Sequence, residues 1–124
     1  MFMARVVGTV WSSVKWDGLQ GLRMLLVRPY HLDDLVRSDG RVADEGVPPE
    51  GLHDGVVVAD ILGAGPGEDV VVAYGHAARV AIEPDLAPGE APRFPIDAAV
   101  VAIVDRYQVE GGDARASDTS RRVP

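Results

Sequence analysis

Short apolar segments alternate with loops rich in glycine and proline along most of the 124-residue chain. Four of these segments are rich in Val, Leu, Ile, Thr or Trp, which suit the pleated surface of a strand. The predicted strands cover residues 5–11, 22–28, 56–62 and 69–74. The second segment is apolar enough for part of a helix, but Pro29 stops it before helical length is reached. Strands therefore dominate the prediction.

The rest of the pattern adds one more strand and little helix. Residues 76–79 have room for one helical turn. The apolar segment 96–104 is compatible with a short helix at 97–99, with Asp97 as its cap. That helix would pass into a fifth strand that reaches Val109.

Two long loops separate the predicted strands, at residues 33–55 and 82–95, and only a little strand near Val42 is expected within them. Five strands with long loops and little helix predict an all-β fold. Closure of the sheet into a barrel is expected because it leaves no exposed strand edge. The predicted architecture is a small five-stranded closed barrel with one or two short helical turns.

The apolar pattern also places the domain boundary. Beyond Gly111 and Gly112 the chain contains no large apolar residue except Val123. Such a segment cannot bury enough surface to offset the entropy lost on ordering. We therefore predict one barrel domain over residues 1–110 and a disordered C-terminal tail over 111–124.

Charge narrows the classes of partner. The net charge is −7, and the stretch 33–54 holds seven acidic residues against two arginines, a local net charge of −5. Nucleic-acid binding depends on a surplus of Lys and Arg, so a nucleic-acid partner is not expected. Eleven of the twelve basic residues are arginine and the twelfth is Lys15, a bias that suits fixed ion pairs and interfaces.

The composition also bears on the cellular compartment of the protein and on the catalytic and metal-binding residues available to it. The chain has no cysteine, which excludes disulfides, thiolate zinc sites and cysteine nucleophiles. The longest apolar run, 98–104, is far shorter than the roughly 18 residues that span a membrane. Arg5 interrupts the apolar start, so no signal peptide is expected. We expect a soluble intracellular protein that does not contact membranes.

The glycine-rich segment after the third predicted strand is the main candidate site. It consists of Gly63, Ala64, Gly65, Pro66 and Gly67. A phosphate-binding loop would precede a helix, whereas this one precedes a strand opened by two carboxylates. The alternatives are a tight turn whose glycines need positive φ, or a loop of small residues that crowds a symmetry axis.

No other constellation predicts catalysis, a cofactor site or a metal site. His31, His53 and His76 lie about twenty residues apart and lack the short spacings of a ready metal pair. Ser12 and Ser13 lie near Lys15 but lack a nucleophile elbow and are expected to satisfy backbone groups. Two further aromatic residues, Trp11 and Trp16, are expected to form a core or interface pair, with sugar or base stacking as the minor alternative.

Four segments in order resemble the bacterial microcompartment vertex proteins. The first spans Ala4-Arg-Val-Val-Gly-Thr-Val-Trp-Ser-Ser-Val-Lys15 and continues at Leu19-Gln-Gly-Leu-Arg-Met-Leu-Leu-Val27. The second is Val58-Ala-Asp-Ile-Leu-Gly-Ala-Gly-Pro-Gly-Glu68, similar to the family's Gly-Ala-Gly-x-Gly-Glu loop. The third is Gly75-His-Ala-Ala-Arg79, where the family has Gly-Ser-x-Ala-Arg, and the fourth is Pro95-Ile-Asp-Ala-Ala-Val-Val-Ala-Ile-Val-Asp105.

The resemblance implies a barrel of the oligonucleotide-binding-fold type that assembles as a cyclic homopentamer. Such pentamers cap the vertices of polyhedral shells in the bacterial cytoplasm, as in carboxysomes and ethanolamine-utilisation compartments, beside hexameric and trimeric shell proteins. The implied role is structural, without enzymatic activity or cofactor. It places the loop from Gly63 to Gly67 near the fivefold axis. His76 and Ala77 depart from the family pattern, and loops 33–55 and 83–95 are longer than its core needs.

Two other classes remain as alternatives. A small barrel module that binds a ligand or nucleic acid would need a basic stripe with exposed aromatic residues, which seven aromatic residues and a net charge of −7 do not favour. A small enzyme using residues 63–68 would need a base, a nucleophile or a metal set, and the sequence predicts none.

Overall fold

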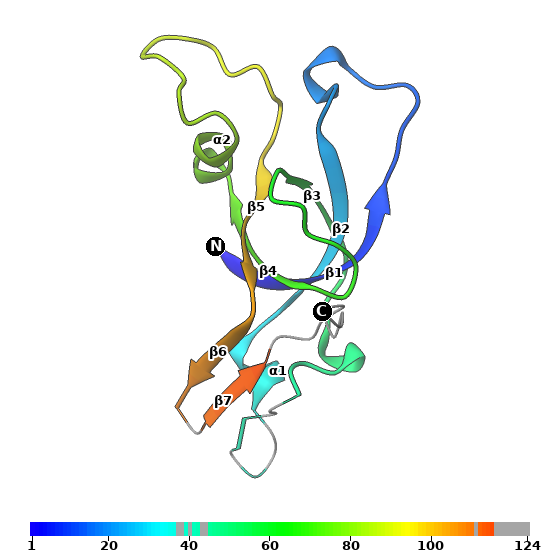
Figure 1. Cartoon of the computed structure of the whole chain (residues 1–124), viewed down its shortest axis with the longest axis vertical. Helices are drawn as coiled ribbons and strands as arrows, with labels where there is room; N and C mark the ends of the chain where they lie inside the picture. The colour runs from blue at the N-terminus through cyan, green and yellow to red at the C-terminus, as the bar shows by residue number, and fades with distance from the viewer. Residues whose placement is uncertain (37–38, 40, 43–44, 111, 116–124) are drawn as a thin grey trace.

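A closed barrel of five strands forms the centre of the computed structural model, which describes residues 1–36, 39, 41–42, 45–110 and 112–115 (Figure 1). The order around the barrel is β1–β2–β3–β5–β4. The strands are β1 (Phe2–Val10), β2 (Arg23–Tyr30), β3 (Val56–Asp60), β4 (Asp69–Tyr74) and β5 (Ala98–Val104). Neighbouring strands are antiparallel except β3 and β5, whose parallel pairing closes the barrel. The predicted five-stranded closed barrel is confirmed.

Alternating side chains fill the interior of this barrel. In β2, Leu25 and Val27 are buried while Leu26 between them is only partly buried, as the period of two residues in a strand requires. Leu25 lies opposite the equally buried Val58 of β3. The interior cluster consists of Ala4, Val6, Leu25, Val27, Val58, Ala64, Val70, Val72, Ala98 and Val100. Ala64 belongs to the loop after β3, so that loop contributes directly to the core.

Helix α2 (His76–Ile82) covers part of the outside of the barrel. Its buried residue Ala78 packs with Ala59 of β3, Ala99 of β5 and Ile96. Partly buried side chains surround this second cluster: Leu19, Leu22, Ile82 and Phe94. Leu19 ends a short 3-10 helix, η1 (Asp17–Leu19). The helical turn predicted at 76–79 is confirmed and continues to Ile82.

The helix considered at residues 97–99 is wrong. Ala98 already belongs to β5, where it lies opposite Tyr74 of β4. The β4–β5 ladder continues from there to Val104 opposite Asp69. This long-range pairing overrides the local capping signal of Asp97, which lies in a bend before the strand.

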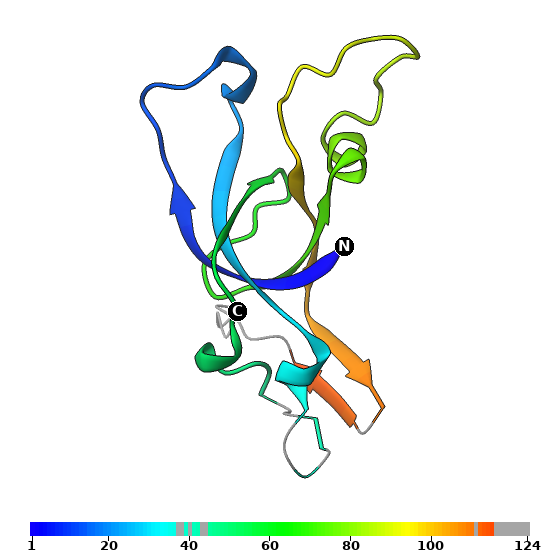
Figure 2. The same cartoon turned by 180° about the vertical axis from the view of Figure 1, so that it is seen from behind.

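A smaller lobe lies below the barrel in Figure 1, and the reverse view in Figure 2 agrees. It contains α1 (Leu32–Leu35), η2 (Pro49–Gly51), β6 (Arg106–Val109) and β7 (Gly112–Arg115). Its buried cluster joins Tyr30, at the end of β2, to Leu35 and Val47. The little strand predicted near Val42 is an isolated bridge to Val36.

The predicted boundary between barrel domain and tail differs from the structure. The fifth predicted strand divides at Asp105, and its second part, β6, pairs with β7 in an antiparallel hairpin. Ordered structure therefore continues through residues 112–115, which were assigned to a disordered tail over 111–124. Residue 111 and residues 116–124 lie outside the described residues.

Candidate functional site: the loop between β3 and β4

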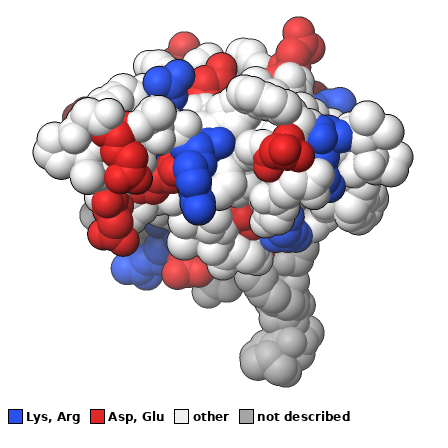
Figure 3. All heavy atoms as spheres, turned by 90° about the horizontal axis from the view of Figure 1, so that it is seen from above, with Lys and Arg blue, Asp and Glu red and all other residues white. Residues whose placement is uncertain are grey.

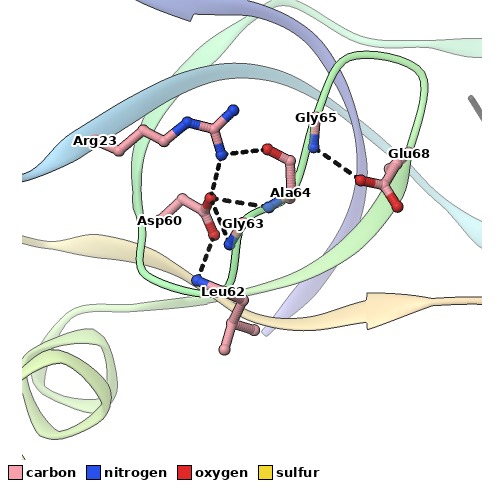
Figure 4. A network of polar contacts seen from close by, with 7 residues as sticks. All are labelled: Arg23, Asp60, Leu62, Gly63, Ala64, Gly65 and Glu68. Carbon is pink, nitrogen blue, oxygen red and sulfur yellow. Dashed lines mark hydrogen bonds and ion pairs between the residues drawn. The ribbon is translucent and has the colours of Figure 1, made fainter.

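Residues 61–68, here called the β3–β4 loop, are shaped by the carboxylate of Asp60 at the end of β3. The amide of Leu62 donates to Asp60 Oδ1 at 3.0 Å. The amides of Gly63 and Ala64 donate to Asp60 Oδ2 at 3.1 and 2.9 Å (Figure 4). An aspartate that binds the amides just after it is a standard turn former. One side chain thus fixes the first half of the loop.

Arg23, at the start of β2, balances the buried charge of Asp60. Its Nη1 lies 2.8 Å from Asp60 Oδ2 and also donates to the carbonyl of Ala64. The Asp60 side chain has no exposed surface, whereas that of Arg23 is 43% exposed. A buried carboxylate is tolerated only when it is paired and hydrogen-bonded, and both conditions hold here.

The second half of the loop is tied to β1. The amide of Gly65 donates to Glu68 Oε1 at 2.8 Å. The amide of Gly67 donates to the carbonyl of Val6 at 2.7 Å, and the amide of Val6 donates to the carbonyl of Glu68 at 2.9 Å. With Ala64 fully buried in the core, the loop has one defined conformation within the subunit.

The fold explains two of the three glycines in this loop. Gly63 and Gly67 have φ values of 88° and 90°, in the region that only glycine adopts without strain. Gly65 has no such φ, and a β-carbon there would meet only Glu68 Oε1 at 3.7 Å, an ordinary contact. The tight-turn interpretation therefore accounts for Gly63 and Gly67 but not for Gly65.

A second buried polar cluster joins three barrel strands to β6. Arg5 Nε donates to Asp69 Oδ1 at 3.1 Å, and the hydroxyl of Tyr30 donates to Asp69 Oδ2 at 2.8 Å. Burial, followed by the negative charge of Asp69, raises the pKa of Tyr30 far above its usual range. The same causes raise the pKa of Tyr107 to about 12. Both phenols therefore stay protonated at physiological pH, and the Tyr30 hydroxyl acts as a hydrogen-bond donor to Asp69.

Two of the three histidines, far apart in the sequence, meet in the structure. The rings of His31 and His53 lie 4.6 Å apart between centroids. His53 Nε2 lies 3.1 Å from Asp34 Oδ2, which also accepts from the amide of His31 at 2.7 Å. The backbone bond, then His53, lowers the pKa of Asp34. Sequence spacing missed this contact, while His76 lies exposed in α2.

The structure also tests the other features considered in the sequence: a phosphate-binding loop, a metal site, the two tryptophans and a membrane span. β4 follows the glycine-rich loop, so the helix that a phosphate-binding loop needs is not there. Within the described ranges, no group of three or more His, Asp or Glu side chains has the geometry of a metal site. Trp11 and Trp16 are both exposed, so the core alternative is wrong and the interface alternative remains a prediction. Across the same residues, no helix is long and apolar enough to cross a membrane.

The barrel and its fixed loop define a small β-barrel protein. Comparison with known proteins makes this assignment specific. Residues 1–105 match the family described as "Ethanolamine utilisation protein EutN/carboxysome". The chain is 40% identical over 105 residues to the carboxysome shell vertex protein CcmL of Thermosynechococcus vestitus, covering 85% of this chain and 84% of that protein.

Further relatives agree. The microcompartment shell vertex protein GrpN of Rhodospirillum rubrum is 34% identical over 108 residues, which cover 87% of this chain and 97% of GrpN. The solved structure of GrpN, described as a pentameric microcompartment shell protein, matches with a TM-score of 0.56 at 30% identity, covering 88% and 98% of the two chains. The structure of Nostoc CcmL matches with a TM-score of 0.62 at 31% identity, covering 94% and 100%.

The chain belongs to the EutN/CcmL family of microcompartment shell proteins. The resemblance expected from the four sequence segments is confirmed, and so is the vertex-capping structural role that it implied. The segment that matched the Gly-Ala-Gly-x-Gly-Glu pattern is the β3–β4 loop, whose conformation is fixed by Asp60 and Glu68.

Proposed function

We propose that five copies of this chain form a ring that caps the vertices of a bacterial microcompartment shell in the cytoplasm. The observation that carries the proposal is family membership together with the match to GrpN, a pentameric shell protein. Hexagonal tiles alone form a flat sheet, and fivefold points are what let such a sheet close. The role is structural, like that of the shell vertex proteins CcmL and GrpN to which the chain is similar.

We further propose that Gly63, Ala64, Gly65, Pro66 and Gly67 lie near the fivefold axis. Gly65 supports this placement because nothing in the subunit requires glycine there. A small residue without a reason inside the subunit suits a position that neighbouring copies approach closely. Because Asp60 and Glu68 fix the loop, each copy presents the same surface to the axis.

Light scattering coupled to size exclusion tests the ring. We expect a mass of five subunits at micromolar concentration, and a stable monomer or dimer would overturn the proposal. Gly65→Trp then tests the axis placement, with Ala91→Trp, in the exposed loop before β5, as the matched control. Crowded bulky rings cost about 1–3 kcal/mol per copy, so Gly65→Trp should weaken the ring while the subunit still folds. Equal assembly of the two variants would place the loop away from the axis.

The partners follow from the position at a vertex. We propose that the outer rim of the ring contacts hexameric and trimeric shell proteins, since facets built of such tiles border each vertex. Co-expression with a hexameric shell protein is expected to give closed shells, and omission of this chain to leave shells open at their vertices. Closed shells without this chain would contradict the proposal.

A further inference from the structure

Two tryptophans stand on the connection between β1 and β2, and both face solvent. Trp11 is 86% exposed, Val14 91% and Trp16 71%. We call residues 11–16 the tryptophan knob. The connection projects away from the barrel at the upper right of Figure 1, and the view from above shows wide uncharged surface between scattered charges (Figure 3). Large apolar side chains close together on the surface are typical of an interaction site. Tryptophan is among the residues that contribute most to binding free energy at protein interfaces.

A hollow of about 800 Å³ opens where the ends of all five barrel strands meet. The strand-end residues in its lining are Phe2, Pro29, Val56, Tyr74 and Ala98. The rings of Phe2 and Tyr74 stack with centroids 6.1 Å apart, and Tyr74 is exposed. We call this hollow the barrel-end pocket. Its size and its aromatic wall suit bulky apolar side chains.

The charges of the knob and the pocket are complementary. Lys15 is the only charged residue within the knob and the only lysine of the chain. Asp54 and Asp97 line the pocket and are exposed. The other titratable groups in its lining are His31, His53 and Tyr74. The exposed Asp17 follows the knob directly, so the cationic feature of this projection is the single Lys15 side chain. That side chain can face the carboxylates of the acidic, aromatic hollow, which favours one orientation of the contact.

The knob and the pocket lie at opposite ends of the same strand. β1 begins with Phe2 in the pocket and ends at Val10, immediately before Trp11. In Figure 1 the start of β1 lies at the left of the barrel and the β1–β2 connection at the right. A subunit therefore does not fill its own pocket with its own knob. A contact between two different patches of identical chains is head-to-tail, the type that generates a ring when the rotation between successive copies closes.

We propose that the tryptophan knob of each copy docks into the barrel-end pocket of the next copy. This inference rests on the proposed ring and names the surfaces that hold it together. The occupant of the pocket is thus a second copy of this chain, and Lys15 of the knob pairs with the carboxylates at the pocket.

Intrinsic fluorescence tests the proposal directly, because the only two tryptophans of the chain are both in the knob. In the intact ring, verified by light scattering, we expect blue-shifted emission that acrylamide quenches weakly. Trp11→Ser should raise the protein concentration at which half of the rings dissociate by at least ~10-fold, the effect of losing one interface anchor. A ring with fully quenchable, water-like emission would overturn the docking and leave the proposed function standing. Absence of any ring would overturn both.

Cross-linking tests the head-to-tail geometry without depending on dissociation. The chain has no cysteine, so Val14→Cys combined with Asp97→Cys introduces the only two thiols. Oxidation should give a covalent ladder that ends at five subunits. The control, Val14→Cys with Asp33→Cys, places the second thiol on an exposed residue of α1 outside the pocket and should give no ladder. A ladder in the control alone, dimers only, or protection of the tryptophans only after a tile protein is added would each overturn the proposal.

Discussion

Two connections of the barrel, the β3–β4 loop and the β1–β2 connection, differ in what determines their conformation. In the first, a buried carboxylate binds three amides and an arginine, and Ala64 lies in the core. In the second, Lys15 Nζ donates to the carbonyl of Ser12 at 3.1 Å, while Trp11 and Trp16 stay in solvent. Internal polar contacts and burial thus shape the first loop, whereas the second leaves large apolar side chains exposed in the subunit.

The difference separates a loop whose shape is set within the subunit from a projection whose apolar side chains can contribute free energy on assembly. A loop with internal polar contacts has its shape before assembly, so it can set the spacing between copies without an ordering cost at that step. A projection with exposed tryptophans contributes free energy only when it is covered. Substitutions in the β3–β4 loop should therefore change the stability of the subunit, and substitutions in the knob should change assembly.

Asp60→Ala should have the largest effect on stability. It leaves three backbone amides without their acceptor. It also removes the carboxylate partner of Arg23, whose side chain is partly exposed to water. We expect a loss of about 3 kcal/mol in the free energy of unfolding, within the range for breaking a buried pair. Urea unfolding at one fixed protein concentration measures it, because assembly is linked to folding.

The control for this variant is Asp85→Ala, at an exposed position of the loop before β5. Its unfolding free energy should stay within about 0.5 kcal/mol of the wild-type value. If Asp60→Ala and Asp85→Ala unfold at the same urea concentration, the hydrogen bonds of Asp60 do not determine the loop.

A pair of glycine variants separates the demands of the turn from those of assembly. Gly63→Ala puts a β-carbon at a φ of 88°, which costs about 1–2 kcal/mol of subunit stability. Gly65→Ala meets only an ordinary contact, so thermal unfolding of the subunit should change by less than about 0.5 kcal/mol. Equal losses in the two variants would mean that both glycines are needed by the turn, and the case for Gly65 at the axis would fail.

The sequence predicted the parts of this fold that depend on side-chain pattern. Segments such as 69–74 show the apolar, β-branched composition of a strand, and β4 has those bounds. The pattern missed β7 because Gly112 and the three residues after it have low strand propensity and pair only with their neighbour β6. The helix considered at 97–99 failed for the opposite reason, since the distant partner β4 decided the conformation of an ambiguous apolar run.

The position of the candidate site was predictable from the sequence, but the hydrogen bonds that fix its conformation were not. The glycine-rich pattern located the β3–β4 loop, whereas the turn-forming role of Asp60, which precedes it, does not follow from the glycines. The spacing of His31 and His53 in the sequence does not predict their contact. The two rings meet because a long loop returns to the end of β2, where the amide of His53 donates to the carbonyl of Pro29. For Trp11 and Trp16 the sequence leaves a core pair and an interface pair open, and the exposure of both side chains in the subunit excludes the core.

The smallest expected effect extends the comparison to helix α1, which contains Asp34. Its carboxylate fixes the start of α1 and holds His53, and its pKa in the folded state is lowered. A lowered pKa contributes stability above the unfolded pKa of about 3.9 that is lost as the pH falls through the folded value. Asp34→Asn keeps a capping oxygen but does not titrate there. Between pH 5 and 3 the wild-type chain should therefore lose up to about 1 kcal/mol more than the variant, the scale of a partly exposed pair. Thermal unfolding followed against pH measures the difference, and parallel curves over that range would show that Asp34 does not hold the start of α1 and His53 through its charge.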